Sequence, residues 1–422
     1  MAIKSGRVGV APDQVDAYGR VVASDTLVDQ LKDVLPQTEL IPLLVLRNGD
    51  YSPPEGKGYG EVSVIVPTGY SVNDIALGAP TGSIAITIPR ESEVARSAFR
   101  GCLGITSASV MLSSTINSYA FANCNNLASF TGPNVQVIGD YGFYQCHALS
   151  TLSLPLVYSL GSYCFAECDL LIGVDLSSVQ TAGSYCFYDS GVILVTLDNM
   201  TTLGHHSFNK CSSLASISAA HLVTIDDSTF YGCSSLSSIN FPSATTIKGA
   251  AFRDCTSLQN AIFPKVTSVH GAQDFNNCPA NLVFPSLTAI GSQNALSTWK
   301  GEKLDFGTGF VTLGYMTFNG MNSNSFPFNT LIIRNSTSVP TLANASNLAA
   351  AGAFRSGGSG GTIYIPEVLY NHLGDGTSLD YLSSTNWAAV LSTNANNTFA
   401  KIEGSYYETH YADGSLISEV TL

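Results

Sequence analysis

Cysteine is the reactive side chain that recurs most regularly in this sequence. The chain has ten cysteines, and eight of them follow one another at intervals of about 22 residues or a multiple of that interval: Cys102, Cys124, Cys146, Cys168, Cys211, Cys233, Cys255 and Cys278. An even number of cysteines is compatible with a disulfide framework, and thiolates can hold zinc. One cysteine per repeat has no obvious partner, however, and no CxxC pair or suitably spaced histidine pair occurs.

The replacements at this position favour packing over chemistry. Ser190, Trp299 and Met321 occupy the same place in other repeats, so the position accepts small and apolar side chains alike. A free cysteine behaves as a small buried hydrophobic residue. We therefore expect structural thiols here, and also at Cys164 and Cys186, the other two cysteines.

Histidine and aspartate suggest few further sites. His205 and His206 are adjacent, so their side chains point apart and joint metal binding is disfavoured. Oxygen ligands for Ca²⁺ could come from Asp226-Asp227, or from Asp375 with Asp380, although a solvated turn is the simpler interpretation. The sequence contains no HExxH, Walker or GxGxxG-plus-acid motif, and its one match to GxSxG, Gly357–Gly361 (GGSGG), is a glycine-rich stretch typical of a flexible loop. We predict no catalytic residue, no metal and no cofactor, and hence a protein that is not an enzyme.

Phenylalanine recurs with the same period and lies three residues before each repeated cysteine. The series comprises Phe99, Phe121, Phe143, Phe165, Phe187, Phe208, Phe230, Phe252, Phe275 and Phe318, with Leu296 in the one remaining place. A fixed period of this length is typical of a solenoid, in which each repeat stacks on its neighbours. The rings are predicted to form an internal column.

Each repeat carries the signals of one coil. In Leu127–Cys146 (LASFTGPNVQVIGDYGFYQC) a short alternation of apolar and polar residues predicts a half-buried strand, and a proline ends it. A second apolar pair, Val135 and Ile138, turns the chain again. We expect a helical or 3-10 turn to carry the Phe-x-x-Cys pair inward. The predicted fold is an α/β solenoid, a right-handed stack of coils of about 22 residues with a parallel β-sheet.

The sequence outside the repeats predicts two caps. Residues 1–90 contain a candidate helix at 26–35, strands at 40–46 and 62–66, and an apolar run at 83–90. Residues 91–335 hold about eleven repeats. Residues 336–422 are expected to form a small α+β cap, with a strand and helix from Thr362, a helix near Trp387 and a hairpin at Asp413-Gly414. An uncapped end coil would leave its apolar side wet.

Composition excludes some partners. Charged residues make up 12% of the chain, where about a quarter is usual, and the net charge is −13. Nucleic acid is disfavoured because it requires a basic surface. No apolar run is long enough for a membrane span, and the first residues show no apolar signal-peptide segment.

The repeat unit LxxLxLPxVxxIGxYAFxxC resembles the BspA-type leucine-rich repeat. The resemblance covers residues 91–335, and it is plainest in Leu127–Cys146 and in LSSINFPSATTIKGAAFRDC (Leu236–Cys255). The stretch LRNGDYSPPEGKGYGEVSVIVP also resembles a short β module of prophage tail-type and surface proteins. These resemblances imply surface-displayed proteins that bind host proteins, other bacteria or glycans and share no catalytic residues. The implied location is the cell surface, the extracellular space or a phage particle.

The predicted binding face consists of the residues that flank the inward apolar residues of the strands. It comprises Ser129, Thr131, Thr151, Ser153, Asp175, Thr196, Ser216, Ser218, Ser238, Asn240 and Asn260. This face is small, polar and almost uncharged, so it is either a solvated sheet surface or a platform for a protein or glycan. Tyr144, Tyr158, Tyr231 and the tyrosines of the tail, Tyr406, Tyr407 and Tyr411, are candidates for stacking against sugar rings.

The functional prediction is recognition or adhesion at a bacterial surface or on a phage tail, directed at a protein or glycan of a host or neighbouring cell. A structural component or spacer of a prophage tail or baseplate is the alternative, and homo-oligomerisation or assembly into a virion stays open. A hydrolase acting on surface glycans is disfavoured, because paired carboxylates do not stand out in the sequence.

Overall fold

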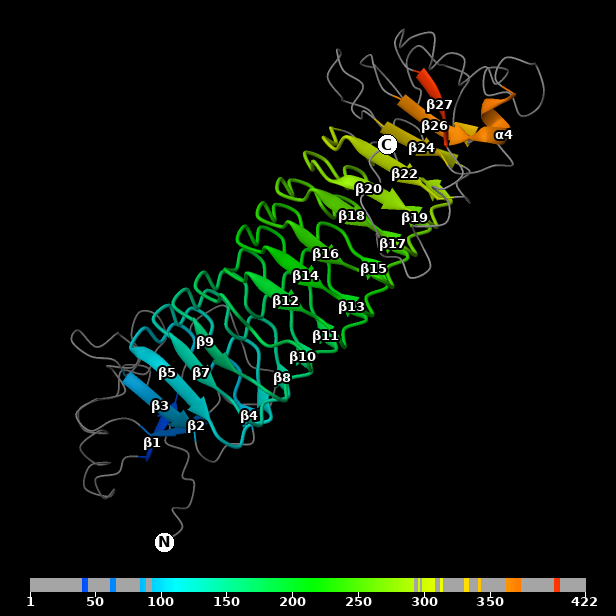
Figure 1. The fold of residues 1–422 in the computed structure, drawn as a ribbon. Coiled ribbons are helices and arrows are strands. Elements are labelled where there is room, and N and C mark those ends of the chain that lie inside the picture. The colour runs from blue at the N-terminus through cyan, green and yellow to red at the C-terminus, as the bar shows by residue number, and fades with distance from the viewer. Residues whose placement is uncertain are drawn as a thin grey trace. The chain divides into compact units, whose positions relative to one another are not determined.

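The structure is a computed structural model that describes residues 40–44, 61–65, 84–88, 93–291, 295–296, 298–307, 312–313, 330–333, 341–342, 362–372 and 398–402. The chain comprises two compact units, residues 1–178 and 179–422. Within each unit the chain winds in coils of about 22 residues whose strands run parallel (Figure 1). The predicted solenoid is therefore confirmed. The predicted domain boundaries near residues 90 and 335 stay predictions.

Residues 1–178 contribute two strands per coil. The first strands build a sheet in the order β1-β2-β3-β5-β7-β9, which we call the first sheet of this unit: β1 (Leu40–Leu44), β2 (Glu61–Ile65), β3 (Ile84–Ile88), β5 (Ile105–Val110), β7 (Ser129–Thr131) and β9 (Thr151–Ser153). The second strands, only two residues long, pair in parallel: β4 (Glu93–Val94), β6 (Thr115–Ile116), β8 (Val137–Ile138) and β10 (Ser159–Leu160). These second strands correct the expectation that the second apolar pair of each repeat only turns the chain.

Residues 179–422 repeat the arrangement. The first strands are β12 (Leu194–Thr196), β14 (Ser216–Ser218), β16 (Ser238–Asn240), β18 (Asn260–Ile262), β20 (Asn281–Phe284), β22 (Lys303–Phe306), β24 (Thr330–Ile333), β26 (Thr362–Pro366) and β27 (Thr398–Ile402). The second strands are β11 (Thr181–Ala182), β13 (Thr202–Leu203), β15 (Thr224–Ile225), β17 (Thr246–Ile247), β19 (Ser268–Val269), β21 (Ala289–Ile290), β23 (Thr312–Leu313) and β25 (Thr341–Leu342).

The predictions for the segments before and after the repeats have mixed outcomes. β1 and β2 form an antiparallel pair, and β3 joins the parallel stack by pairing with β5. A helix, α4 (Glu367–Tyr370), follows β26 as expected, whereas β27 was not anticipated. The candidate helices at 26–35 and near Trp387, and the hairpin at Asp413-Gly414, lie outside the described residues. No helix among the described residues is long and apolar enough to cross a membrane.

The recurring phenylalanines form the core of each unit. In residues 1–178, Phe99, Phe121, Phe143 and Phe165 are fully buried and stack at centroid distances of 5.0, 5.3 and 5.4 Å. In residues 179–422, the rings from Phe187 to Phe275 stack at 5.1, 5.9, 5.4 and 5.2 Å. Leu296 is buried in the same series, and Phe318 lies outside the described residues. Because strands lie about 4.8 Å apart, coil stacking brings successive rings into contact.

The prediction of a helical or 3-10 turn around each phenylalanine is wrong for the described coils. Between Asn117 and Cys124, backbone amides alternate in direction. The amides of Ala120 and Ala122 donate within the turn, whereas those of Tyr119, Phe121 and Asn123 donate to carbonyl groups of the next coil. Tyr119 and Asn123 consequently adopt φ values of 60° and 61°. A helix would use these amides internally, whereas the alternating turn adds a further ladder of hydrogen bonds between coils.

The left-handed positions give a stability prediction. Gly101 has a φ of +74°, and a Cβ built on it would meet nothing within 4 Å, so Gly101→Ala should act through backbone strain alone. We expect it to lower the free energy of unfolding by about 1–2 kcal/mol. Gly173→Ala is the matched control because its Cβ would also meet nothing, without a positive φ. Equal denaturation midpoints for the two variants would contradict this account.

Candidate binding surface

The predicted binding face lies on the first sheet of residues 1–178. β7 and β9 pair in register, so Ser129 lies beside Thr151 and Thr131 beside Ser153. Ser107 and Ser109 of β5 extend the same two columns. These hydroxyl side chains are exposed or half-buried, and the residue between them on β7, Phe130, is buried. The result is two parallel columns of hydroxyl groups without a charged side chain on β5, β7 or β9.

Residues 179–422 carry a corresponding face. Thr196, Ser218 and Asn240 follow one another in register on β12, β14 and β16, and the Asn240 amide donates to the Ser218 hydroxyl at 3.3 Å. Leu194, Ser216 and Ser238 form the second column. Leu194 is 64% exposed, so the column begins with an apolar side chain on the surface. On β18, Asn260 is exposed and accepts a hydrogen bond from the side chain of Asn281.

Asp175 departs from the prediction. Its side chain is exposed, but residues 171–178 contain a single bridge residue, Gly173, in place of a three-residue strand. We call residues 171–178 the interrupted coil. The Asp175 carboxylate accepts a hydrogen bond from the Ser177 amide at 2.9 Å. Hydrogen bonds from the Ser177 side chain and backbone lower the pKa of Asp175, so this carboxyl is ionised at neutral pH.

A pocket of about 130 Å³ lies where β9 meets the interrupted coil. Its walls are mainly apolar and include Leu152, Leu154, Val157, Phe165, Val174 and Leu176. Ser153 and Asp175 are its polar lining residues, and both belong to the predicted face. The sequence signal for this site is the loss of the alternation of apolar and polar residues in Leu171–Leu176 (LIGVDL).

The tyrosines offer ring edges more than ring faces. Tyr119, Tyr141 and Tyr163 lie at the left-handed turn position and stack on one another at 4.7 Å, with Arg100 over the Tyr119 ring at 5.0 Å. Stacking of this kind occupies the ring faces that a sugar would need.

The three stacking candidates named from the sequence differ in their surroundings. Tyr144 lies edge-on to a neighbouring tyrosine and donates to Glu167 at 3.1 Å. Burial and this hydrogen bond raise the pKa of Tyr144 to about 12. Tyr231 has the Arg253 guanidinium over its ring at 5.3 Å. Tyr158 is 43% exposed, and the tyrosines of the tail lie outside the described residues.

The ten cysteines are free and buried. The thiol of Cys124 donates to the Phe99 carbonyl of the preceding coil at 2.9 Å. The same bond recurs at 2.9–3.2 Å from Cys146, Cys168, Cys211, Cys233 and Cys255. Cysteine therefore combines a small apolar volume with a weak donor aimed at a carbonyl group. The hydrogen bond was not anticipated from the sequence.

Thiol reactivity follows from this burial. Desolvation raises the pKa of Cys211 and Cys278 to about 12, and it raises those of Cys146, Cys233 and Cys255 well above the usual value. The thiolate is the reactive form, so the native chain at pH 8 should resist Ellman's reagent. The unfolded chain should then release colour for ten thiols. Rapid labelling of the native protein, or fewer thiols after unfolding, would contradict the structure.

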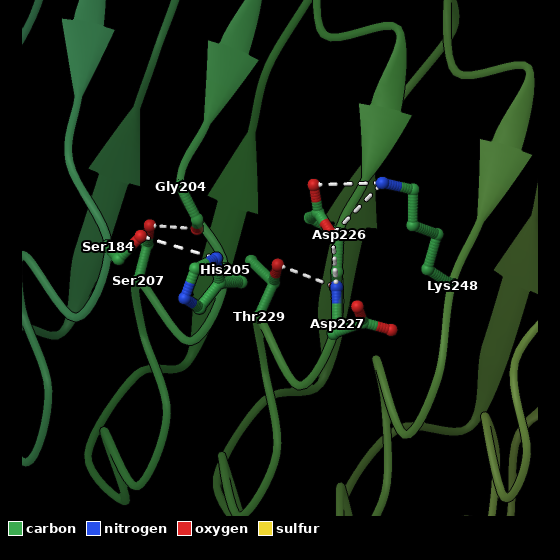
Figure 2. A network of polar contacts seen from close by, with 8 residues as sticks. All are labelled: Ser184, Gly204, His205, Ser207, Asp226, Asp227, Thr229 and Lys248. Carbon is green, nitrogen blue, oxygen red and sulfur yellow. Dashed lines mark hydrogen bonds and ion pairs between the residues drawn. The ribbon is translucent and has the colours of Figure 1, made fainter.

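The histidine and aspartate candidates contact both one another and neighbouring side chains. The Asp227 backbone amide donates to the Asp226 carboxylate at 2.8 Å (Figure 2), and the rings of His205 and His206 lie edge to face at 5.6 Å. The His205 ring lies 3.3 Å from the Ser184 hydroxyl, whereas the His206 ring stacks on Tyr185 at 4.4 Å. The Lys248 ammonium donates to both oxygens of Asp226 at 3.2 Å. Within the described ranges no three His, Cys, Asp or Glu residues are grouped to hold a metal ion, and Asp375 and Asp380 lie outside those ranges.

Comparison with known families resolves what the repeats are. The model of the BspA type leucine rich repeat region matches residues 92–215, 181–294 and 223–338, which together make up more than half of the chain. The chain belongs to the BspA-type leucine-rich repeat family. A search of the curated proteins finds no match.

Solved structures with similar folds are bacterial leucine-rich repeat proteins. A leucine-rich repeat protein from Bacteroides ovatus is 16% identical, covering 84% of this chain and all of its own, with a TM-score of 0.32. The pneumococcal vaccine antigen PcpA is 14% identical over 81% of this chain and 97% of its own, with a TM-score of 0.35. A leucine-rich cell surface protein from Faecalibacterium prausnitzii is 16% identical over 60% of this chain and 95% of its own, with a TM-score of 0.28.

One BspA-type repeat of this chain carries an unusual buried acid. Asp274 directly precedes Phe275, where other repeats have a small residue such as Ala120 or Ala251. Its side chain is fully buried, and neither carboxyl oxygen has a hydrogen-bond partner. Burial raises the pKa of Asp274 well above its usual value, and the nearby backbone amides of Gly271 and Ala250 only partly offset this.

Proposed function

We propose that this chain is a non-catalytic recognition protein. The exposed face of the first strands of its coils binds a protein or glycan of a host or neighbouring cell. The observation that carries the proposal is the in-register columns of exposed or half-buried hydroxyl and amide groups on β7 and β9 and on β12, β14 and β16, in which Leu194 is the one apolar member. Parallel stacking repeats the same group along each column. Such a face presents many donors and acceptors at a regular spacing.

The low charge of this face narrows the kind of recognition. Because β5, β7, β9, β12, β14 and β16 carry no ionised side chain, these strands contribute hydrogen bonds and shape to binding, and their contribution depends little on salt. Family membership supports display at a bacterial surface, since proteins of this repeat type are typically surface adhesion or binding proteins. A phage tail is the other setting in which the same face would serve for attachment.

Array binding tests the proposal. The full chain should bind saturably to at least one component of an array of glycans and extracellular-matrix proteins. The double variant Thr131→Arg and Ser153→Arg places two large cations on the face and should weaken that binding by about tenfold or more, because the groups lie at adjacent register positions. Gln136→Arg, an exposed residue between β7 and β8, is the control and should leave the affinity unchanged.

Two results would contradict recognition by this face. One is equal affinity of the double variant and the control. The other is a chain that binds no array component but forms a defined oligomer in light scattering, which would favour the structural component of a tail or baseplate.

A further inference from the structure

We propose that the pocket between β9 and the interrupted coil binds a single apolar side chain of a partner protein. In the partner's sequence, a lysine or arginine lies next to this apolar residue. This inference deepens the proposed function and rests on it. It assigns a specific contact point within the face and selects a protein over a glycan as the partner. The pocket lies entirely within residues 152–176 of the first unit.

The size of the pocket selects a side chain as its occupant. Pockets that enclose drug-sized molecules measure roughly 300–1,000 Å³, whereas this one measures about 130 Å³. An engineered apolar cavity of about 150 Å³ in another protein binds benzene. The pocket therefore matches the apolar part of a leucine, methionine or phenylalanine side chain and is too small for a sugar ring with its hydroxyl groups and hydration.

The lining of the pocket also selects an apolar occupant. Aliphatic surface comes from Leu152, Leu154, Val157, Val174 and Leu176, and the fully buried Phe165 of the internal column also lines the pocket. A sugar inserted here would leave hydroxyl groups without partners, which is costly. An aliphatic or phenyl group would instead gain about 25 cal/mol for each Å² of apolar surface removed from water.

The negative charge of Asp175 at the pocket favours a cationic residue next to the partner's inserted apolar side chain. Asp175 is the single charged residue among the lining residues, and its side chain is exposed. Its pKa is lowered by the hydrogen bonds from Ser177, so the carboxylate persists at and below neutral pH. A lysine or arginine next to the inserted residue can reach this carboxylate while staying in water. The net charge of −13 adds a general attraction for basic partners.

The surroundings suit a protein surface. Leu156 and Tyr158 directly follow lining residues and are 50% and 43% exposed. They place further apolar surface next to the pocket, where a partner's neighbouring side chains would pack. The hydroxyl columns of β7 and β9 end at the same place. A partner segment anchored in the pocket could therefore extend over the hydrogen-bonding groups of the face.

Small probes test the pocket directly. The full chain would be titrated with phenethylammonium, 2-phenylethanol and 3-phenylpropanoate, and binding followed by saturation-transfer NMR and by shifts of protein resonances. We expect the ammonium to bind most tightly and the carboxylate most weakly. Asp175→Asn should weaken the ammonium by about threefold to fivefold and leave the alcohol unchanged. Asp140→Asn is the matched control: Asp140 is also exposed and also accepts a backbone amide, that of Ser162 at 2.7 Å, but does not line the pocket.

Filling the pocket should remove binding of all three probes. Val174 is half-buried at the pocket wall, so Val174→Phe places a ring in the space that a ligand would use. If Val174→Phe does not fold, Ser153→Tyr covers the pocket from an exposed strand position. The inference is overturned if phenethylammonium does not bind at millimolar concentration, if it binds equally well to the filled variant, or if Asp175→Asn and Asp140→Asn have equal effects.

The array partner separates this inference from the proposed function. A protein partner whose affinity falls about tenfold or more in Val174→Phe supports both proposals. A partner that the face variant weakens but Val174→Phe does not overturns the pocket inference and leaves recognition by the face intact. Probe binding at the pocket without any array partner supports the pocket as a site but counts against the recognition function. A glycan as the array partner overturns the assignment of a protein occupant.

Discussion

Phe230→Ala should lower the free energy of unfolding by about 3–5 kcal/mol, the usual cost of deleting a fully buried phenyl ring. Phe230 is completely buried and stacks on Phe208 at 5.9 Å and on Phe252 at 5.4 Å. A third ring, Phe241, lies 5.6 Å away. The substitution therefore removes three aromatic contacts and leaves a cavity within the column. Chemical denaturation followed by circular dichroism measures the effect.

The same variant should also change the shape of the transition. In a repeat protein each coil is stabilised mainly by its neighbours, so a weakened coil reduces the coupling between the coils on its two sides. We expect a broader unfolding curve than for the unmodified chain. Leu194→Ala is the control, because Leu194 is 64% exposed and should contribute less than about 0.5 kcal/mol. A melting curve that Phe230→Ala leaves unchanged would refute a continuous aromatic core.

Asp274→Ala should stabilise the chain at neutral pH by about 1–3 kcal/mol, the range associated with a buried polar group that lacks a partner. The variant restores the small residue found at this position in other repeats, such as Ala251. Because Asp274 is fully buried without a hydrogen-bond partner, its ionised form is strongly disfavoured in the folded state. Removing the carboxyl removes that penalty.

The pH dependence of the stabilisation by Asp274→Ala shows whether the buried carboxyl causes it. Burial raises the folded-state pKa of Asp274 well above the usual aspartate value of 3.8, so the folded state binds its proton more tightly than the unfolded state does. The unmodified chain is therefore most stable, with respect to this group, below pH 3.8, and loses that stability as pH rises through the folded-state pKa. The advantage of Asp274→Ala should be smallest in acid and grow with pH.

A surface aspartate provides the comparison for that experiment. Asp198 is exposed, so Asp198→Ala should change stability by less than about 0.5 kcal/mol at any pH. Equilibrium denaturation at pH 4 and at pH 7 measures both variants. A stabilisation by Asp274→Ala that is the same at the two pH values, or a net destabilisation, would contradict an uncompensated buried carboxyl and would show that the backbone amides of Gly271 and Ala250 offset its burial.

Much of the fold could be predicted from the sequence because its information is periodic. The spacing of Phe143, Phe165 and their equivalents defines a coil length, and one coil cannot bury its apolar side alone. The alternation in Thr151–Ser153 and its equivalents correctly indicated the first strand and its exposed residues. The shared interval also showed that eight of the ten cysteines lie three residues after a recurring phenylalanine.

Other features depend on neighbouring coils and could not be read from one repeat. A tyrosine at position 119 or 141 adopts a left-handed backbone because the amides around it donate to the next coil. Local propensity disfavours that conformation, and the intercoil hydrogen bonds offset its cost. The thiol bond from Cys124 to the Phe99 carbonyl likewise joins groups that are 25 residues apart.

The sequence by itself determined the coil length, the apolar column and the almost uncharged face, because side-chain period and composition decide which residues can be buried. The tertiary structure alone decided the second short strand, the left-handed turns and the pocket beside Asp175. These three features arise where one coil meets the next, and the fit between Leu152 and Val174 depends on the path of both coils in space.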